Sequence, residues 1–313
     1  NERRKGMVHR HSTRPLHSTL HGRNRKAVEY LKEFVASQNK GRIVPIHFNG
    51  LDADFISGFQ AYLTRDKNLA LNTVGKYMRA FRECLNDAHR NGKGIEVPNQ
   101  LIMRGAIPIP EEETTQIYLT PDELDAIYQL DLSQNPRLDR VRDLFIVGCW
   151  TGLRFGDLSR VRPEHVEGNL IKVPTEKTGK LVQIPLQPTV KAIMAKYEGD
   201  FPSGISNQKQ NEYIKEVAAM VPALQVKVMS GRTQGGARME AARHKWELVS
   251  THTARRSFAT NLFRSGFHPK IIMSLTGHKT DRAFMRYIRL TDDDYTDIIL
   301  QSPLFQEAPL RVA

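Results

Sequence analysis

The residues Thr-His-Thr-Ala-Arg-Arg-Ser-Phe-Ala-Thr occupy positions 251–260, where a helix is predicted to begin. His252 and Arg255 stand three positions apart, so a helix places both side chains on one face, where they can meet one phosphate. This pair is a weak motif by itself, because His11 and Arg14 repeat it near the start of the chain. Its meaning depends on the residues around it.

Three more candidate residues occur at fixed places along the second half of the chain. Arg154 follows an apolar helix, residues 144–150, which is expected to stop at Gly152, so packing should hold this arginine in position. His278 lies in Leu-Thr-Gly-His, and Tyr287 follows it by nine positions. Taken singly, His278 also suits a buried histidine, and Tyr287 suits a tyrosine of a core or a helix surface.

A β-hairpin is predicted between Arg154 and the helix that begins near residue 251. Two alternating runs, residues 170–173 and 181–186, flank Thr-Gly-Lys at 178–180, which is a turn signal. Lys177 would lie at the tip of the hairpin, with Lys180 as its rival. Helices surrounding this small sheet predict a mainly α fold with a small antiparallel sheet, of the α+β class.

The chain divides into four predicted parts. Residues 1–24 are basic and are predicted to form an arm or linker, or the remnant of a further upstream domain. Helical apolar spacing predicts a small helical domain over residues 25–107. Prolines and acidic residues indicate a linker at 108–119, after which Thr-Pro-Asp-Glu-Leu opens a second domain, residues 120–313, with a capping box.

Composition favours an anionic partner. The chain of 313 residues has a net charge of +12 and a pI of about 9.7, and clustered basic residues bind nucleic acid by releasing counterions from phosphates. In the helical domain, Lys76, Arg79 and Arg82 recur every three residues away from the apolar stripe and could follow a DNA backbone, or serve only as a solvated face.

Cysteine content and hydropathy suggest the compartment. Cys84 and Cys149 are the only cysteines and have no paired spacing, so neither a disulfide framework nor a zinc cluster is expected. The longest nearly apolar run, residues 144–153, is far shorter than the roughly 20 residues that cross a bilayer. No secretory signal is visible. We therefore expect a soluble cytoplasmic protein with no membrane partner.

Read in order, these segments resemble the tyrosine recombinase (phage integrase) family. The resemblance lies in Thr-Gly-Leu-Arg-x-x-Asp-Leu, the lysine-tipped hairpin ending in Ile-Pro-Leu, the segment 251–260, Leu-Thr-Gly-His and the tyrosine nine positions later. It extends from about residue 25 to the end, so the helical domain resembles the family's core-DNA-binding domain and the second its catalytic domain. Arg-Phe-Gly-Asp-Leu and Glu-Lys-Thr-Gly-Lys are most similar to integrases of Bacteroides-type conjugative transposons.

The resemblance implies a metal-independent reaction without any cofactor, in which a tyrosine attacks a DNA phosphodiester. Arg154 and Arg255 would clamp the phosphate oxygens, whose negative charge grows in the transition state. Tyr287 would be the nucleophile and His252 its proton acceptor, because a phenol with a pKa of about 10 needs one near neutral pH. His278 would donate a hydrogen bond to the phosphate and orient Tyr287.

The same resemblance assigns supporting roles. Lys177 would protonate the departing 5′ oxygen, since its distance from the end of the hairpin fits the family pattern. Lys180 is the alternative acid or a DNA contact, and Arg256 is a further candidate for DNA binding. Asp157 stands where many members have glutamate and is expected to buttress the active site.

The product would be a 3′-phosphotyrosyl link, which a 5′ hydroxyl of another strand can reverse, giving site-specific integration and excision of a mobile element. The implied partners are double-stranded DNA carrying core recombination sites and DNA-bending accessory proteins. Four protomers would act on two duplexes, with monomers in the absence of DNA, and residues 291–305 would dock on a neighbour. In a bacterial cytoplasm the protein would associate with the nucleoid.

Three other functions use some of the same features. A type IB topoisomerase shares the arginine, lysine, histidine and tyrosine chemistry, but acts as a monomer that relaxes supercoils. A metal-dependent transposase needs separated carboxylates and Mg²⁺. A non-catalytic DNA-binding protein would tolerate the loss of Tyr287 in every assay.

Overall fold

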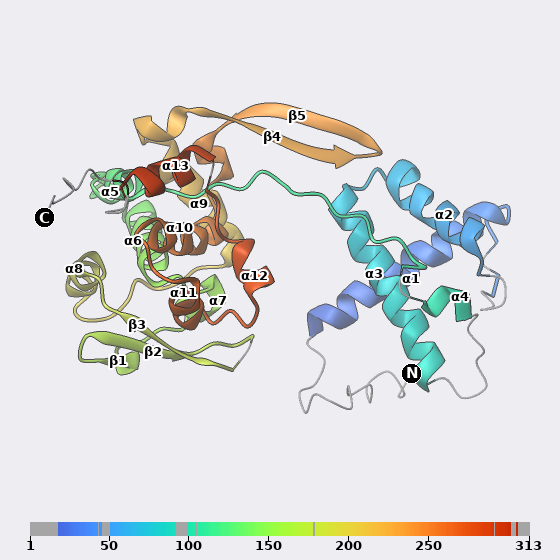
Figure 1. The fold of residues 1–313 in the computed structure, drawn as a ribbon, viewed down its shortest axis with the longest axis horizontal. Helices are drawn as coiled ribbons and strands as arrows, with labels where there is room; N and C mark the ends of the chain where they lie inside the picture. Colours follow the sequence, from blue (N-terminus) through green and yellow to red (C-terminus); the bar gives the residue numbers. More distant parts are fainter. Residues whose placement is uncertain are drawn as a thin grey trace, which may run out of the picture. The chain divides into compact units, whose positions relative to one another are not determined.

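The computed structural model describes residues 18–42, 44–45, 51–91, 99–103, 105–177, 179–290, 292–301 and 305. The chain forms two compact units, one of Asn1–Thr114 with Ser230–Ala241, the other of Thr115–Met229 with Ala242–Ala313 (Figure 1). The predicted second domain was continuous, whereas residues 230–241 belong to the first unit. The chain therefore passes between the units three times.

The first unit is helical, and its core follows the apolar spacing of the sequence. Its helices are α1 (Ser18–Gln38), α2 (Ala53–Ala61), the π-helical turn η3 (Tyr62–Asp66), α3 (Leu71–Asn91) and α4 (Asn99–Ile102). Phe34, Phe59 and Met78 are buried in one cluster, with the Phe34 and Phe59 rings 5.6 Å apart. Asp52 caps α2 by accepting a hydrogen bond from the amide of Phe55 at 2.8 Å.

Most of the predicted basic arm, residues 1–17, lies outside the described residues. Residues 18–24 have a helical backbone, so α1 begins at Ser18 rather than near residue 25. Apolar periodicity did not reveal this extension, because no apolar stripe marks these positions.

Residues 227–244 form a regular hairpin of β4 (Lys227–Gln234) and β5 (Ala237–His244). Its distal part joins the first unit through Glu112. The Glu112 carboxylate accepts hydrogen bonds from the Thr233 amide at 2.8 Å, the Thr233 hydroxyl at 2.7 Å and Arg238 at 3.0 Å. These bonds, together with the charge of Arg238, lower the pKa of Glu112 despite its partial burial.

The second unit combines helices with a three-stranded sheet. Its elements are α5 (Pro121–Tyr128), α6 (Pro136–Thr151), α7 (Phe155–Leu158), η4 (Pro163–His165), β1 (Val166–Glu167), β2 (Leu170–Pro174), β3 (Leu181–Pro185), α8 (Pro188–Lys196), α9 (Asn207–Ala219), η5 (Pro222–Gln225), η6 (Lys245–Leu248), α10 (Thr251–Arg264), α11 (Pro269–Thr276), α12 (Asp281–Met285) and α13 (Asp292–Gln301). The predicted mainly α fold with small antiparallel sheets is confirmed.

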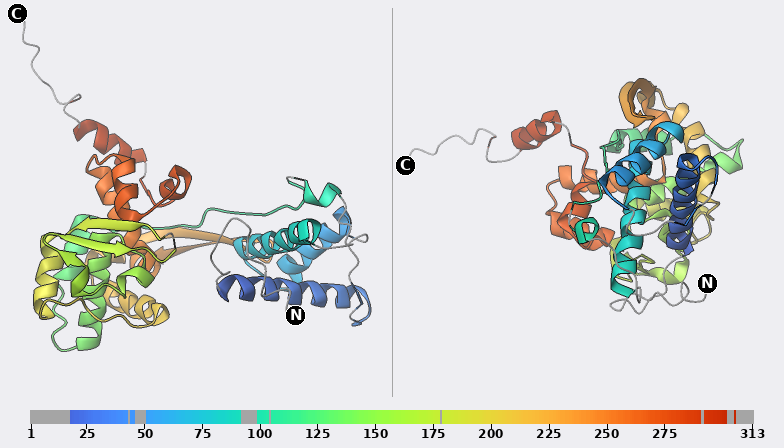
Figure 2. Two further views of the ribbon diagram at one scale, coloured as in Figure 1. Left: turned by 90° about the horizontal axis from the view of Figure 1, so that it is seen from below. Right: turned by 90° about the vertical axis from the view of Figure 1, so that its right-hand side faces the viewer.

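The sheet lies along one side of these helices (Figures 1 and 2). Its strand order is β1-β2-β3, all antiparallel. Ile171 faces Ile184 and Val173 faces Val182 across β2 and β3, and all four side chains are buried. This register brings the two ends of the predicted hairpin turn together.

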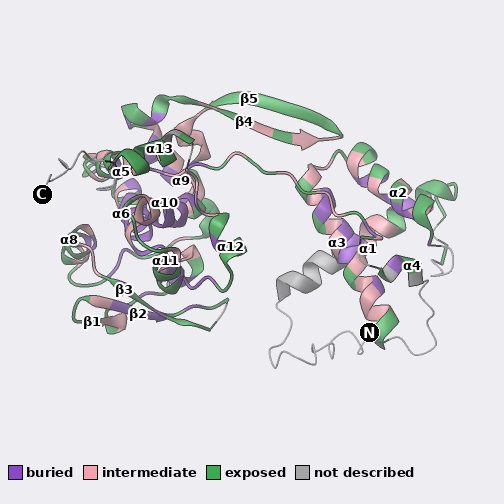
Figure 3. Ribbon diagram, in the orientation of Figure 1, coloured by how far each residue is buried: buried purple, intermediate pink, exposed green. Residues whose placement is uncertain are grey.

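The centre of this unit is the packing of α6 against α10, both largely buried (Figure 3). The predicted capping box opens the unit: Thr120 accepts a hydrogen bond from the Glu123 amide, and Glu123 accepts one from the Thr120 amide. Ser257 of α10 accepts a hydrogen bond from the Leu119 amide at 2.9 Å. These bonds fix α10 against the start of the domain.

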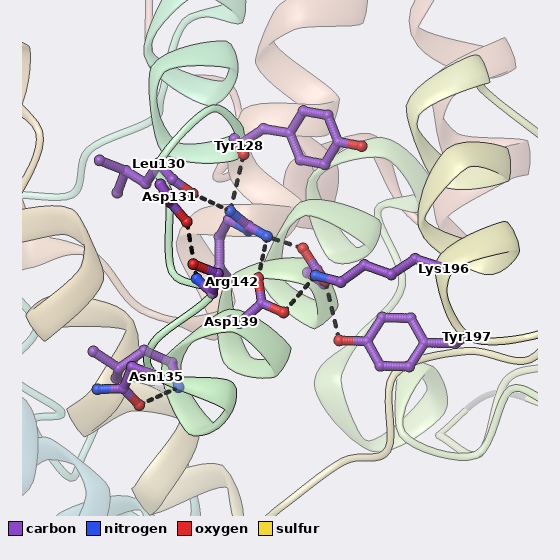
Figure 4. Close-up of polar contacts among 11 residues, drawn as sticks. Tyr128, Leu130, Asp131, Asn135, Asp139, Arg142, Lys196 and Tyr197 are labelled. Atoms are coloured by element: carbon purple, nitrogen blue, oxygen red, sulfur yellow. Dashed lines mark hydrogen bonds and ion pairs between the residues drawn. The ribbon is translucent and has the colours of Figure 1, made fainter.

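A buried network of charges joins α6 to α8 (Figure 4). Asp143 is fully buried and accepts hydrogen bonds from Arg142 Nε at 2.8 Å, Lys196 Nζ at 2.6 Å and the Tyr197 hydroxyl at 3.0 Å. Burial and the Asp143 charge raise the pKa of Tyr197. The carboxylate is thus fully compensated, as a buried charge requires.

Gly152 ends α6 in the left-handed conformation, with φ of +64°. A Cβ atom here would overlap Cδ1 of the Phe258 ring in α10. Gly152→Ala should therefore lower the free energy of unfolding of the full chain by about 3 kcal/mol, the sum of backbone strain and overpacking. Gly168→Ala is the control, because Gly168 also has a positive φ but nothing within 4 Å of its Cβ position. Urea unfolding should show a loss of only about 1 kcal/mol there, and equal losses would contradict the packing argument.

No helix in the described part of the chain is long and apolar enough to cross a membrane.

Candidate active site

Two arginines from different helices form the centre of the site. Arg154 is the residue before α7, and the left-handed turn at Gly152 directs the chain into it. Arg255, in α10, is only 1% exposed and donates a hydrogen bond from NH1 to the Gly152 carbonyl at 2.7 Å. The same short turn therefore positions one arginine and anchors the other.

The hydrogen-bond donors of these guanidinium groups are not all used by the protein. A guanidinium has five N–H donors, and Arg255 uses three: the one to Gly152, and two from NH2 to the Thr276 carbonyl at 2.5 Å and to Nε2 of His278 at 3.2 Å. Among the described residues, the buried Nε of Arg255 and the buried NH1 of Arg154 have no hydrogen-bond partner. Unpaired buried donors of this kind suit an anion.

Burial and the charge of Arg154 lower the pKa of Arg255 to about 10. The two guanidinium groups are close enough to repel each other, and Arg255 remains protonated at neutral pH. An anion placed between them would relieve that repulsion.

Asp157 is a buried carboxylate that lies next to Arg154. It is 2% exposed, and its Oδ2 lies 3.9 Å from NH1 of Arg154. Its Oδ1 accepts hydrogen bonds from the Glu176 amide at 2.9 Å and from Arg160 at 3.1 Å. Asp157 thus links Arg154 to the hairpin turn next to Lys177, which fits the predicted buttressing role.

The hairpin turn carries both candidate lysines on exposed positions. The charge of Lys177 contributes to lowering the pKa of His252 and of His278, which indicates that it lies near both rings. The charge of Lys180 is not among those that lower the pKa of His278. The Lys180 carbonyl accepts a hydrogen bond from the Thr175 amide at 2.9 Å. Electrostatics therefore favours Lys177; Thr178 lies outside the described residues.

His252 is the second residue of α10 and reaches solvent. Partial enclosure by the protein, followed by the positive charges of Arg256, Arg255, Arg154 and Lys177, lowers its pKa below the ordinary value of 6.5. The ring is therefore neutral at physiological pH. A neutral imidazole can accept a proton, as a general base must.

His278 is 7% exposed and bonded at both ring nitrogens. Its Nδ1 lies 2.8 Å from the Thr276 hydroxyl and its Nε2 lies 3.2 Å from NH2 of Arg255. Burial and nearby positive charges lower its pKa to about 3. A neutral ring beside an arginine carries its proton on Nδ1, so the predicted hydrogen bond to a phosphate would need a change of tautomer or protonation.

Tyr287 stands in the turn that follows α12 rather than inside a helix. Its ring centroid is 4.8 Å from that of His278 and 5.4 Å from Cζ of Arg255. Its carbonyl accepts a hydrogen bond from the Thr260 hydroxyl at 3.1 Å, which ties the turn to α10. The phenol thus lies beside His278, which was predicted to orient it, and beside Arg255, which was predicted to clamp the phosphate.

The predicted DNA-contacting residues have different surroundings. On α3, Lys76 is exposed, Arg82 is half-buried and Arg79 forms an ion pair with Glu111. Arg256 is 9% exposed and donates a hydrogen bond to the Ile117 carbonyl at 2.7 Å. This bond uses one of the five donors of the Arg256 guanidinium.

Sequence reasoning did not single out Thr276. Its carbonyl and its hydroxyl bind the two neighbouring groups, Arg255 and His278. The available signal was a hydroxyl residue just before the Gly-His turn. Within the described residues, no three His, Cys, Asp or Glu side chains are grouped so that they could hold a metal ion.

Comparison with known families supplies the context for this site. The profile described as the Phage integrase family matches residues 117–294, and the Phage integrase SAM-like domain matches residues 7–100. The chain therefore belongs to the phage integrase family, the tyrosine recombinases, which are enzymes that cleave and rejoin DNA. No curated protein matched the chain in a sequence search.

Several solved structures share the fold. A variant of the Tn1549 transposon integrase (residues 82–397) in complex with a circular intermediate DNA aligns with a TM-score of 0.64 at 16% identity, over 96% of each chain. A lambda integrase (75–356) dimer bound to a COC′ core site gives 0.58 at 17% identity, over 85% of this chain and 88% of that one. XerH recombinase bound to a difH substrate aligns with a TM-score of 0.59 at 14% identity, over 89% of this chain and 78% of that one.

Proposed function

We propose that this chain is a site-specific DNA recombinase that cuts one strand with Tyr287 and rejoins it to another. The observation that carries the proposal is the convergence of the Tyr287 ring, the bonded pair Arg255 and His278, and Arg154, whose buried guanidinium groups each keep a nitrogen without a hydrogen-bond partner among the described residues. A phosphodiester fits those donors, since it has two anionic oxygens for two guanidinium groups.

The reaction exchanges one phosphodiester for another. The Tyr287 oxygen attacks phosphorus while the bond from phosphorus to the 5′ oxygen breaks, and the phenolic proton passes to His252. Lys177 supplies a proton to the departing 5′ oxygen, which leaves as a hydroxyl. Arg154 and Arg255 bind the non-bridging oxygens, whose charge increases in the transition state.

The intermediate is a 3′-phosphotyrosyl link with a free 5′ hydroxyl. Its bond energy is conserved, so the 5′ hydroxyl of another strand can attack the phosphorus and release Tyr287 without a cofactor or metal. The lowered pKa of His252 keeps its imidazole neutral at physiological pH, which supports its role as the proton acceptor.

The biological substrate we propose is the end of a conjugative transposon of the Bacteroides type. The resemblance of residues 154–158 and 176–180 to such integrases supports this, and a transposon integrase shares the fold over nearly the whole chain. The helical unit would hold the core site, with Lys76, Arg79 and Arg82 along the phosphate backbone. Arg79 would then exchange Glu111 for phosphate.

We further propose a tetramer on two duplexes that assembles from monomers, helped by DNA-bending proteins, in the bacterial cytoplasm. Helix α13, part of the predicted docking segment 291–305, exposes the apolar side chains of Tyr295, Ile299 and Leu300. Asp294 holds this helix to its own unit through Arg264 at 2.9 Å. A neighbouring copy could cover the exposed face.

A nicked suicide substrate tests the proposal. A duplex from the element's end, nicked close to the cleavage site, loses the short 5′-hydroxyl strand after cleavage and should trap the protein on the 3′ phosphate. We expect the covalent complex to form equally well in EDTA. A 5′-phosphate linkage, inhibition by EDTA, or DNA binding without any covalent complex would each contradict the proposal.

A further inference from the structure

The hydroxyl of Thr276 is a buried group beside the reacting residues that the mechanism does not use. Thr276 is the last residue of α11 and is 1% exposed. Gly277 follows with φ of +69°, and this left-handed turn brings His278 back over the end of the helix. Within reach of the Thr276 hydroxyl are the Ile272 carbonyl at 2.7 Å and Nδ1 of His278 at 2.8 Å.

The directions of these hydrogen bonds follow from the chemistry of the partners. The Ile272 carbonyl can only accept, so the single hydroxyl hydrogen of Thr276 is directed to it. The hydroxyl oxygen must then accept from Nδ1 of His278. On the other side of the ring, NH2 of Arg255 can only donate, so Nε2 must accept. Both ends of the chain of bonds therefore require the same tautomer, with the proton on Nδ1.

Thr276 reaches Arg255 by two routes. Its carbonyl accepts a hydrogen bond from NH2 of Arg255 at 2.5 Å, and its hydroxyl acts on the same nitrogen through the His278 ring. Both hydrogens of NH2 are thereby used within the protein. Nε and the second hydrogen of NH1 are the remaining donors of Arg255, and the Tyr287 side chain interacts with the same guanidinium.

We propose that Thr276 is a positioning residue for recombination: its hydroxyl holds His278 in the Nδ1–H tautomer, and Nε2 of His278 thereby holds the guanidinium of Arg255 ready to bind the phosphate. The ring of Tyr287 packs on the same histidine, with the two ring centroids 4.8 Å apart. This inference rests on the proposed function of Arg255 and Tyr287. The neutrality of His278 at ordinary pH agrees with it.

Two substitutions separate the hydroxyl from the shape of the side chain. Thr276→Val keeps the branched shape and removes the hydroxyl, so Nδ1–H would be left buried without an acceptor, and the proton should move to Nε2. That nitrogen could no longer accept from Arg255. Thr276→Ser keeps the hydroxyl and loses only a methyl group.

The tautomer is read by long-range ¹H–¹⁵N correlation spectra of the full-length protein labelled with ¹⁵N-histidine. The His278 signals are identified by their loss in His278→Gln. We expect Nδ1–H in the wild type and in Thr276→Ser, and a shift toward Nε2–H in Thr276→Val. Covalent trapping on the suicide substrate should slow by about tenfold in Thr276→Val, with unchanged DNA affinity, and recover in Thr276→Ser.

Each outcome decides one of the two proposals. An Nε2–H tautomer in the wild type, or wild-type trapping by Thr276→Val, would overturn the role of Thr276. Trapping that falls in Thr276→Ser as much as in Thr276→Val would assign Thr276 to packing alone. If the wild type traps no DNA but the His278 tautomer differs between the wild type and Thr276→Val as expected, the inferred hydrogen bonds of Thr276 stand and the proposed function fails. Should Thr276→Val not fold, Thr276→Ala takes its place.

Discussion

Replacing Tyr287 with phenylalanine is expected to abolish covalent trapping on a nicked substrate, a loss of roughly 1,000-fold or more, because the change removes the attacking oxygen. The ring should remain in place. It packs against the cluster that contains Phe284 and Ile288, and the backbone of the turn is held by Thr260. DNA affinity, measured by fluorescence anisotropy, should therefore be unchanged.

Tyr295 provides the matched control for this experiment. It is the next tyrosine along the chain and lies on α13, where it is 42% exposed. Tyr295→Phe should trap DNA at the wild-type rate. Trapping that persists in Tyr287→Phe and disappears in Tyr295→Phe would show that the nucleophile has been assigned to the wrong residue.

Arg154→Lys should slow covalent trapping by about 100-fold while leaving DNA affinity within a factor of about two. Lysine keeps the positive charge but lacks the planar fork of the guanidinium, so it cannot bind a phosphate through two parallel N–H donors. Because the interaction strengthens as charge develops on the phosphate, the loss should be seen in the single-turnover cleavage rate and hardly at all in binding.

Arg160→Lys is the control that distinguishes binding of the phosphate by Arg154 from neutralisation of the Asp157 carboxylate. Arg160 shares that carboxylate at 3.1 Å, yet its side chain is 53% exposed and also pairs with Glu176. Cleavage should change by no more than about threefold, since exposed pairs contribute little. If both variants lose activity equally, the role of Arg154 is to neutralise Asp157 rather than to bind phosphate.

Much of the fold was predictable because it is encoded locally. The capping box at Thr120, the end of α6 at Gly152 and the alternation in β2 and β3 depend on residues a few positions apart, and each is found in the structure. The regular hairpin β4–β5 was harder to predict. β5 is exposed along almost its whole length and β4 has no fully buried position, so neither strand shows the alternation that burial on one face imposes.

Contacts between distant segments explain the predictions that differed. Residues 230–241 belong to the first unit because Thr233 and Arg238 bind Glu112, more than 100 positions earlier in the chain. No spacing rule relates such residues. A distant contact also adds to what was predicted for Arg256: it remains a predicted DNA contact, and it donates a hydrogen bond to the Ile117 carbonyl, 139 positions away.

By itself, the sequence determined the family, the order of the candidate residues and the helical face shared by His252 and Arg255, because these depend on local spacing and residue type. Only the tertiary structure decided which groups the Arg255 guanidinium binds, which lysine carries its charge near the histidines and what each ring nitrogen of His278 contacts. Those properties arise where α6, α10, α11 and the hairpin turn meet. Hydrogen-bond direction and electrostatic shifts depend on distances in space, which the order of residues does not contain.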